Sequence, residues 1–276
     1  MHDFSMRLIH QLIKKNKYPF LQNKRERFAV QSIILTFGLL VTQLIWQDFR
    51  FPMVIILSVL AYLLTIWSLC EDIKKIEWIM LFILPVFFTA ATSLFYFLLP
   101  ERWFTRLVIG SSFAIGSYAI LLIGNIYNVS AERSIQLLRV AQSVGLLITL
   151  AIVFLSSSII FSIRANFLQN FILIMPIIFI LSLQNFWAIN LEDHLNAKLF
   201  IYSLVVSLGV GELTLALSFY PVEISTAALF VTASFYAMVG IIQQYFLERL
   251  FKNTIREYII TFIFTMLIVI WTTKWG

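Results

Sequence analysis

The stretch LFIYSLVVSLGVGELTLALSFY, residues 199–220, decides the fold class. It is almost purely apolar over about 20 residues, the length that an α-helix needs to cross the roughly 30 Å hydrocarbon core of a bilayer. Its one charged residue is Glu212. Comparable runs recur along the chain. Because a chain in lipid must satisfy its backbone hydrogen bonds internally, we predict that each run is a transmembrane helix.

The composition of all 276 residues supports this interpretation. The chain is 61% hydrophobic and 12% charged, whereas soluble domains have about 25% charged residues. A membrane β-barrel is not expected, because its strands would alternate polar and apolar residues over about 10 positions. The formal net charge is +6, but the basic residues gather in the N-terminal segment and in short loops. That distribution indicates membrane orientation and no nucleic-acid partner.

Nine apolar runs predict an all-α polytopic bundle of transmembrane helices. Residues 28–276 then form a single transmembrane helical domain. Residues 1–27 form a basic tail, which either lies on the membrane as an interfacial amphipathic helix or is disordered and only fixes orientation. A capping box of Thr254 and Glu257 is expected to start the last span, after a short surface helix over residues 247–252. The predicted spans are 28–46, 51–70, 78–99, 107–126, 140–162, 171–189, 199–220, 224–246 and 255–275.

Basic residues and tryptophans set the predicted orientation. Alternate connections place 15 basic residues on the side of the N-terminus and 5 on the other side. The positive-inside rule therefore predicts a cytoplasmic N-terminus. All seven tryptophans fall near predicted span ends, where an indole keeps its ring in the interface and its N–H in contact with water. Membrane lipids are the expected partners, and the oligomeric state is left open.

Glu212 is the main candidate functional residue, because ionisable groups inside a membrane are costly and mark functional sites. It lies 13 residues after Leu199, about 20 Å into its span. No basic residue lies in the apolar core of any predicted span, so a cationic partner is missing. The candidate polar partners at comparable depth are Thr232, Ser156, Ser157 and Ser158.

Gly209 and Gly211, just before Glu212, have two interpretations. Glycines in a membrane helix either let the helix flex beside a transport site or permit close packing with a neighbour. In the first case Glu212 is a proton- or cation-linked carboxylate that contacts a solute. In the second it bridges two helices by hydrogen bonds.

Two more polar groups lie near the predicted cytoplasmic face. Arg133 and Arg139, beside Asn128, are candidate contacts for a lipid phosphate, and ordinary positive-inside flanking residues are the alternative. A second group is interpreted as a solvated loop, because no further ligand pair gives it the spacing of a metal site. It consists of Gln184, Asn185, Asn190, Glu192, Asp193 and His194. No phosphate-binding loop or nucleophile motif appears, so we predict no catalytic residue, metal site or cofactor.

Three segments carry a resemblance to a known family. They are GELTLALSFYPV at residues 211–222, ERLFKNTIREY at residues 248–258 and, as a weaker echo, NIYNV at residues 125–129. They resemble a family of uncharacterised multi-span bacterial membrane proteins. The resemblance implies a location in the bacterial cytoplasmic membrane and brings no activity, substrate or cofactor.

Transport of a small or lipid-like solute is the leading functional hypothesis, with Glu212 as its carboxylate. One alternative is an intramembrane or interfacial lipid-modifying enzyme acting near Arg133, Arg139 and Asn128. The other is a non-catalytic membrane assembly or scaffold protein, whose apolar faces meet another membrane protein.

Overall fold

The computed structural model describes residues 23–42, 49–69, 76–100, 102–130, 135–191 and 194–273. These residues contain nine α-helices and no strand, which confirms the all-α prediction. The helices are α2 (Lys24–Thr42), α3 (Arg50–Leu69), α4 (Glu77–Tyr96), α5 (Trp103–Ser130), α6 (Ile135–Ser162), α7 (Phe167–Asn190), α8 (Ala197–Leu217), α9 (Ile224–Phe246) and α10 (Lys252–Thr272).

Eight of the described helices, α3 to α10, are long and apolar enough to cross a membrane. The protein is therefore a polytopic membrane protein. The ninth, α2, has a charged first turn that includes Glu26. The end of the first predicted span, residues 43–46, lies outside the described residues, as does the predicted N-terminal tail up to residue 22.

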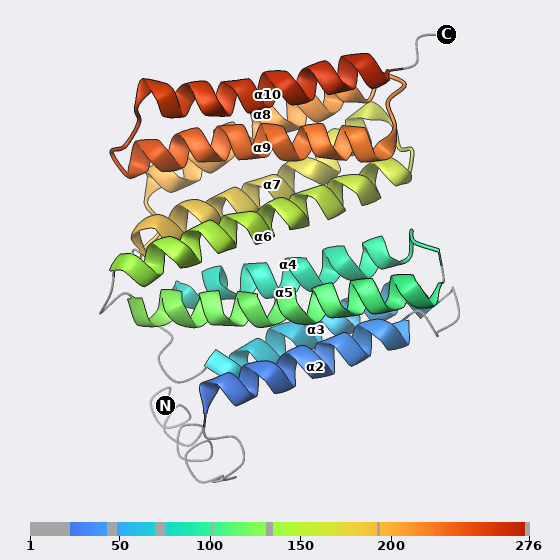
Figure 1. Cartoon of the computed structure of the whole chain (residues 1–276), viewed down its shortest axis with the longest axis vertical. Coiled ribbons are helices and arrows are strands. Elements are labelled where there is room, and N and C mark those ends of the chain that lie inside the picture. Colours follow the sequence, from blue (N-terminus) through green and yellow to red (C-terminus); the bar gives the residue numbers. More distant parts are fainter. Residues whose placement is uncertain are drawn as a thin grey trace, which may run out of the picture.

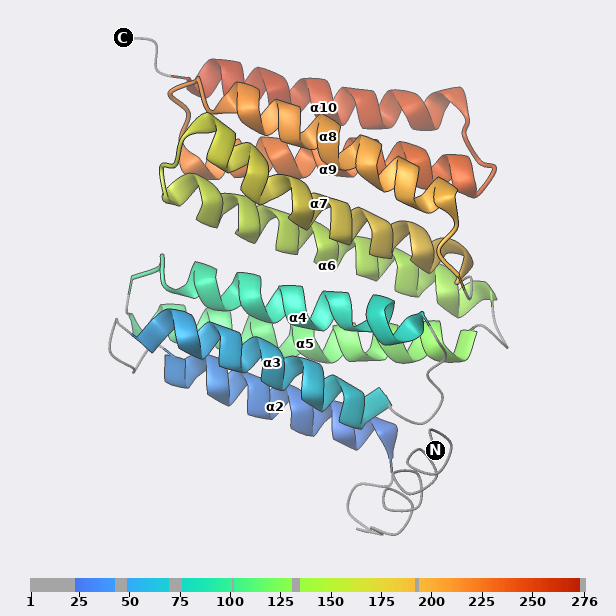
Figure 2. The same cartoon turned by 180° about the vertical axis from the view of Figure 1, so that it is seen from behind.

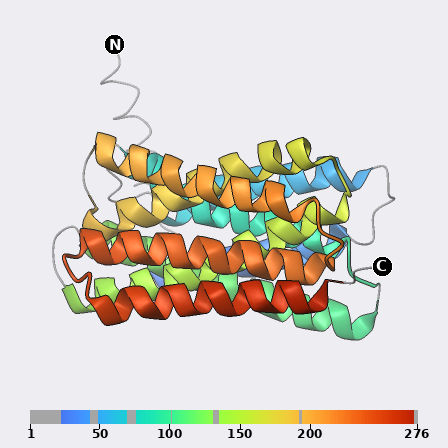
Figure 3. The same ribbon diagram turned by 90° about the horizontal axis from the view of Figure 1, so that it is seen from above.

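Consecutive helices run antiparallel, and the bundle extends along the long axis of the molecule from α2 and α3 at one end, past α6, to α10 at the other (Figures 1 and 2). Helices α2 to α5 pack on one another, and α6 packs against both α4 and α5. On its other side α6 packs against α7 and α9, which in turn contact α8 and α10. Seen from above, the helix axes lie close to one direction (Figure 3). This arrangement fits a bundle in which the candidate spans α3 to α10 cross one bilayer.

Small side chains make up much of the buried surface of α9. Helices in lipid associate through close packing, because lipid tails solvate apolar side chains as well as protein does. Two of the buried hydroxyls are satisfied within their own helices: Ser203 and Ser234 each donate to the carbonyl four residues earlier, at 2.7 Å. The small buried residues of α9 are Ala227, Ala228, Ala233, Ser234, Ala237 and Gly240.

Helix α10 lies at the edge of the bundle, since only 11% of its span is buried, against 61% for α7. The predicted capping box is wrong: α10 begins at Lys252, and its N-cap residue Phe251 makes no side-chain capping bond. The predicted surface helix over residues 247–252 is also wrong. Glu248 has a positive φ of 55°, and a turn followed by irregular backbone joins α9 to α10.

Most of the described tryptophans are exposed near helix ends, as predicted. Trp187 is the exception, because it is 1% exposed and its ring meets that of Tyr127 edge-on, with centroids 6.4 Å apart. Trp187 therefore belongs to the core and not to the interface. Trp46 and Trp275 lie outside the described residues. The exposed tryptophans are Trp67, Trp78, Trp103 and Trp271.

Candidate functional site

Glu212 lies on the exposed side of α8. The helix ends at Leu217, earlier than the predicted end at Tyr220, so Glu212 is about 7 Å from the end of the helix. Within the described residues, its carboxylate forms no hydrogen bond or ion pair. The neighbouring helices thus do not enclose Glu212, and its position in the span is shallower than predicted.

The predicted polar partners of Glu212 bond elsewhere or have no partner. Thr232 and Ser158 donate to the carbonyl four residues earlier in their own helices, at 2.7 and 2.8 Å. Ser156 and Ser157 are buried on α6, and the Ser157 hydroxyl has no hydrogen-bond partner in the described part of the chain. None of the four bonds Glu212 there, and a functional link between them stays a prediction.

Gly209 and Gly211 lie within the unbroken helix α8. A Cβ atom at Gly209 would lie 2.7 Å from Cε of Met238 on α9, and one at Gly211 would lie 2.8 Å from Cε2 of Phe171 on α7. Both distances are too short for carbon atoms in contact, so the glycines let neighbouring side chains approach the helix backbone. Flexing of α8 at these residues stays a prediction.

The two candidate arginines are not both described. Arg139 is exposed near the start of α6, whereas Arg133 lies in a segment outside the described residues. Asn128, at the end of α5, is 7% exposed. Contact of the two arginines with a lipid phosphate therefore stays a prediction.

A buried network of polar side chains joins α6, α7 and α9. Asn185 on α7 donates to Oγ1 of Thr149 on α6 at 2.9 Å and accepts from Nε2 of Gln243 on α9 at 3.4 Å. The solvated-loop interpretation is wrong for Gln184 and Asn185, which are 2% and 5% exposed, because α7 continues beyond them. His194 is exposed, while Glu192 and Asp193 lie outside the described residues.

Gln142 on α6 fixes the end of α7. Its Nε2 donates to the carbonyls of Ala188 and Ile189, at 2.9 and 3.2 Å. These are among the last carbonyls of α7, which find no partner within their own helix. A side chain from α6 thus satisfies the end of α7 and holds the two helices in register there.

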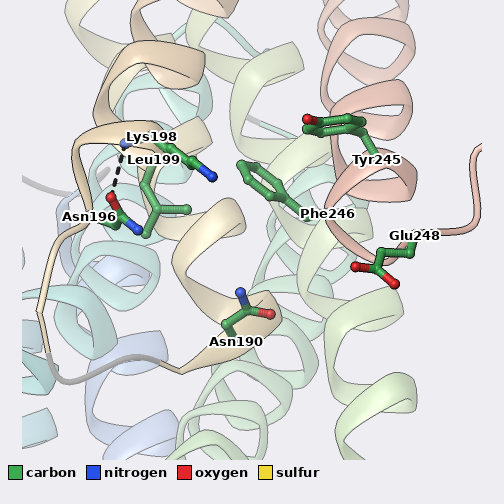
Figure 4. A pocket seen from close by; sticks show the side chains of 7 residues that line it. All are labelled: Asn190, Asn196, Lys198, Leu199, Tyr245, Phe246 and Glu248. Carbon is green, nitrogen blue, oxygen red and sulfur yellow. Dashed lines mark hydrogen bonds between the residues drawn. The ribbon is translucent and has the colours of Figure 1, made fainter.

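A cavity of about 310 Å³ lies beyond this network, where α7 and α9 end and α8 begins (Figure 4). We call it the α7–α9 pocket. Its volume is at the lower end of the range of ligand sites, about 300–1,000 Å³. Leu199 and Phe246 supply apolar surface, and the other lining residues are polar or charged. The pocket is lined by Asn190, Asn196, Lys198, Leu199, Tyr245, Phe246 and Glu248.

The pocket carries one cation and one anion on opposite sides (Figure 4). Lys198 lies in the first turn of α8, where the N-cap residue Asn196 accepts a hydrogen bond from the backbone N–H of Lys198 at 3.3 Å. Glu248 follows the end of α9. In the described part of the chain, neither side chain forms an ion pair, with the other or with a third residue. Among the described residues, nothing neutralises either charge before a ligand does.

The backbone at Glu248 is in the left-handed region, with φ 55°. Residues with a Cβ adopt this conformation at a cost of roughly 1–2 kcal/mol. The N–H of Glu248 donates to the carbonyl of Tyr245 at 3.1 Å, and the next N–H, of Arg249, donates to that of Gln244 at 2.9 Å. These bonds close the end of α9 and fix the backbone that carries the carboxylate.

Comparison with known proteins identifies a family whose function is unknown. A protein-family model described as "Protein of unknown function (DUF5656)" matches residues 35–272, a range that contains α3 to α10 and the whole pocket. No curated protein and no solved structure matches the chain. The match agrees with the predicted resemblance to an uncharacterised family and covers most of the sequence. The chain belongs to this family of proteins of unknown function.

Proposed function

We propose that this membrane protein binds a lipid-like solute in the α7–α9 pocket and moves it across the bilayer. One observation carries the proposal: a cavity at the ends of three candidate spans combines apolar walls with a cation and an anion that have no partner in the described residues. Such a site suits a molecule with a polar headgroup and an apolar tail.

We place the pocket on the cytoplasmic face of a bacterial cytoplasmic membrane. The described basic residues support this orientation, since eight lie at the pocket end of the bundle and four at the opposite end, and the cytoplasmic side normally has the excess. The eight are Lys24, Arg25, Arg27, Arg139, Lys198, Arg249, Lys252 and Arg256, and the four are Arg50, Arg102, Arg106 and Arg164.

Glu212 lies on nearly the same face of α8 as Lys198, which gives it a role in the proposal. Lys198 and Glu212 are separated by just under four helical turns, so they project within about 40° of the same face and about 21 Å apart along the helix. Both side chains are exposed. We assign Glu212 the role of contacting the solute headgroup after it has left the pocket and moved along α8.

Filling the pocket should stop the movement of lipid. The full-length chain is reconstituted into vesicles of phosphatidylethanolamine and phosphatidylglycerol that contain traces of lipid labelled on the acyl chain. The rate at which label becomes accessible to dithionite then reports transbilayer movement. In Asn190→Trp, an indole occupies the cavity, and we expect the initial rate to fall at least about fivefold.

His194→Trp is the matched control, because His194 is exposed nearby and does not line the pocket. Its rate should stay within about twofold of the unmodified protein, as for most surface changes away from a site. The proposal is wrong if the unmodified protein moves lipid no faster than empty vesicles do. Equal rates for Asn190→Trp and the unmodified protein would contradict it as well.

Glu212→Gln should slow movement and leave binding unchanged. Loss of one exposed charge contact of about 1 kcal/mol corresponds to about a fivefold lower rate, whereas the pocket itself is untouched. The same vesicle assay gives the rate, and fluorescence anisotropy of the labelled lipid with purified protein gives the affinity. Ala216→Gln, which adds an amide at another exposed position on α8, is the control. If Glu212→Gln moved lipid at the rate of the unmodified protein, the carboxylate would have no role in the movement.

A further inference from the structure

We infer that the ligand of the α7–α9 pocket is zwitterionic, with its anionic group beside Lys198 and its cationic group beside Glu248. The inference rests on the proposed function and names the chemical class of its ligand. The headgroup of phosphatidylethanolamine, with a phosphate and an ammonium group, has this chemistry. A small soluble phosphate ester that carries an amine has it too.

The side of the pocket formed by α8 is built for a negative group. Lys198 extends over Leu199 toward Phe246 and so points across the cavity (Figure 4). The pocket also includes Asn196, the N-cap residue of α8. The first N–H groups of a helix carry partial positive charge and favour anions. The Lys198 ammonium and the helix terminus therefore act on the same side of the ligand.

The opposite side is built for a positive group. Glu248 lies just beyond the end of α9, and Asn190 is the last residue of α7. Helix C-termini carry partial negative charge and favour cations. The rings of Tyr245 and Phe246 line the same side, and aromatic faces attract ammonium groups. The Phe246 ring is held in place by Phe186 and Tyr202, with centroids 5.6 and 5.3 Å away.

A ligand with only one charge would fit the pocket less well. A purely anionic headgroup would meet the like charge of Glu248, and a purely cationic one would meet that of Lys198. Juxtaposed like charges are a common means of rejecting a wrong partner. Since Lys198 and Glu248 do not pair with each other, a ligand that bridges them gains both contacts without breaking an existing ion pair.

The buried network beneath the pocket holds in place the side that α7 and α9 form. Gln243, one turn before Phe246, bonds Asn185 on α7 at 3.4 Å, and Asn185 bonds Thr149 on α6 at 2.9 Å. The ends of α7 and α9 are thereby tied together below the cavity. A site whose groups are already held in place loses less entropy when its ligand binds.

The inference is tested by comparing two lipids with different headgroups, one zwitterionic and one anionic. Binding of acyl-chain-labelled phosphatidylethanolamine and phosphatidylglycerol to the purified full-length chain is measured by fluorescence anisotropy. We expect about tenfold tighter binding of phosphatidylethanolamine. Glu248→Gln should abolish this preference, chiefly by improving the binding of phosphatidylglycerol. Lys198→Gln should weaken the binding of both lipids about tenfold, and Lys198→Arg should restore the affinity of the unmodified protein.

Water-soluble competitors identify the source of the headgroup. Glycerophosphoethanolamine has the zwitterionic group without a tail, and glycerophosphoglycerol is its anionic counterpart. Competition by the first alone supports a zwitterionic site that also takes a free solute. No competition by either, together with the preference for phosphatidylethanolamine, supports a zwitterionic site that requires the lipid tail. Competition by both alike would overturn the inference.

Equal binding of the two lipids, unchanged in Glu248→Gln, would also overturn the zwitterionic class. The proposed function would survive that result if Asn190→Trp still blocked movement. Conversely, if Asn190→Trp changed neither binding nor movement, the pocket itself would be excluded as the site. Thermal unfolding of each variant shows that the fold is retained, which we expect because Lys198 and Glu248 are exposed.

Discussion

Gly211→Leu is expected to lower the free energy of unfolding by about 2–3 kcal/mol, as overpacking of a close helix contact does. Even a Cβ atom at this position would lie 2.8 Å from the Phe171 ring, so a leucine must push α7 and α8 apart or force the ring aside. In detergent, the midpoint of thermal unfolding, followed by tryptophan fluorescence, should fall by about 5–10 °C.

Ala216→Leu is the matched control, because it adds a larger side chain at an exposed position of the same helix. Its midpoint should stay within about 2 °C of the unmodified protein, in the range of ordinary surface substitutions. If Gly211→Leu unfolded at the temperature of this control, Phe171 would have to move aside at little cost. The close contact between α7 and α8 would then not explain the glycine.

Asn185→Leu should have the second large effect, a loss of about 2 kcal/mol. The substitution removes the bonds to Thr149 and Gln243 and leaves the Gln243 amide to find another partner in a part-buried setting. Single hydrogen bonds between membrane helices average only about 0.6 kcal/mol, so most of the loss comes from unsatisfied groups. Unfolding in detergent measures it.

A double-mutant cycle separates the network from the packing of Asn185. Gln243→Leu alone and the double variant Asn185→Leu with Gln243→Leu complete the cycle. Because the two amides bond each other, the double variant should lose at least about 0.5 kcal/mol less than the two single variants together. Strict additivity would mean that the bond between them contributes nothing to stability.

The helices were the part of this fold that hydropathy alone could predict. The run at 224–246 coincides with α9, and the run at 140–162 ends where α6 ends. In these segments apolar length decides the structure, since a helix that crosses lipid must be apolar throughout. The start of α10 was misplaced. A capping-box sequence shows only that a helix could begin at that point, and α10 begins earlier, at Lys252.

Burial was harder to predict, because it depends on helices that are distant in the sequence. Gln184 and Asn185 are polar residues near a span end, and that pattern is typical of a solvated loop. Both are buried in the bundle, and Asn185 finds its partners on α6 and α9, which are distant in the sequence. The sequence did contain one indication of this burial. Gln142 and Gln243 lie inside predicted spans, and buried amides form hydrogen bonds with polar groups on neighbouring helices.

The side of α8 on which Glu212 lies could not be predicted either. Its depth was also overestimated, because α8 ends at Leu217 and not at Tyr220. Since α8 is apolar on all sides, periodicity does not distinguish a lipid-facing side from a packed one. The pocket was missed for a related reason. Asn190, Lys198 and Glu248 come from three separate segments of the chain, and each looks like an ordinary residue at a span end.

If Glu248 binds an ammonium group as we propose, its left-handed backbone opposes thermostability to ligand recognition. Glycine would adopt φ 55° without the Cβ penalty of roughly 1–2 kcal/mol, so the most stable residue at this turn is one that cannot bind an ammonium group. Engineering for heat resistance alone would therefore favour loss of the carboxylate. Selection for ligand binding would keep an acid at position 248 despite its cost.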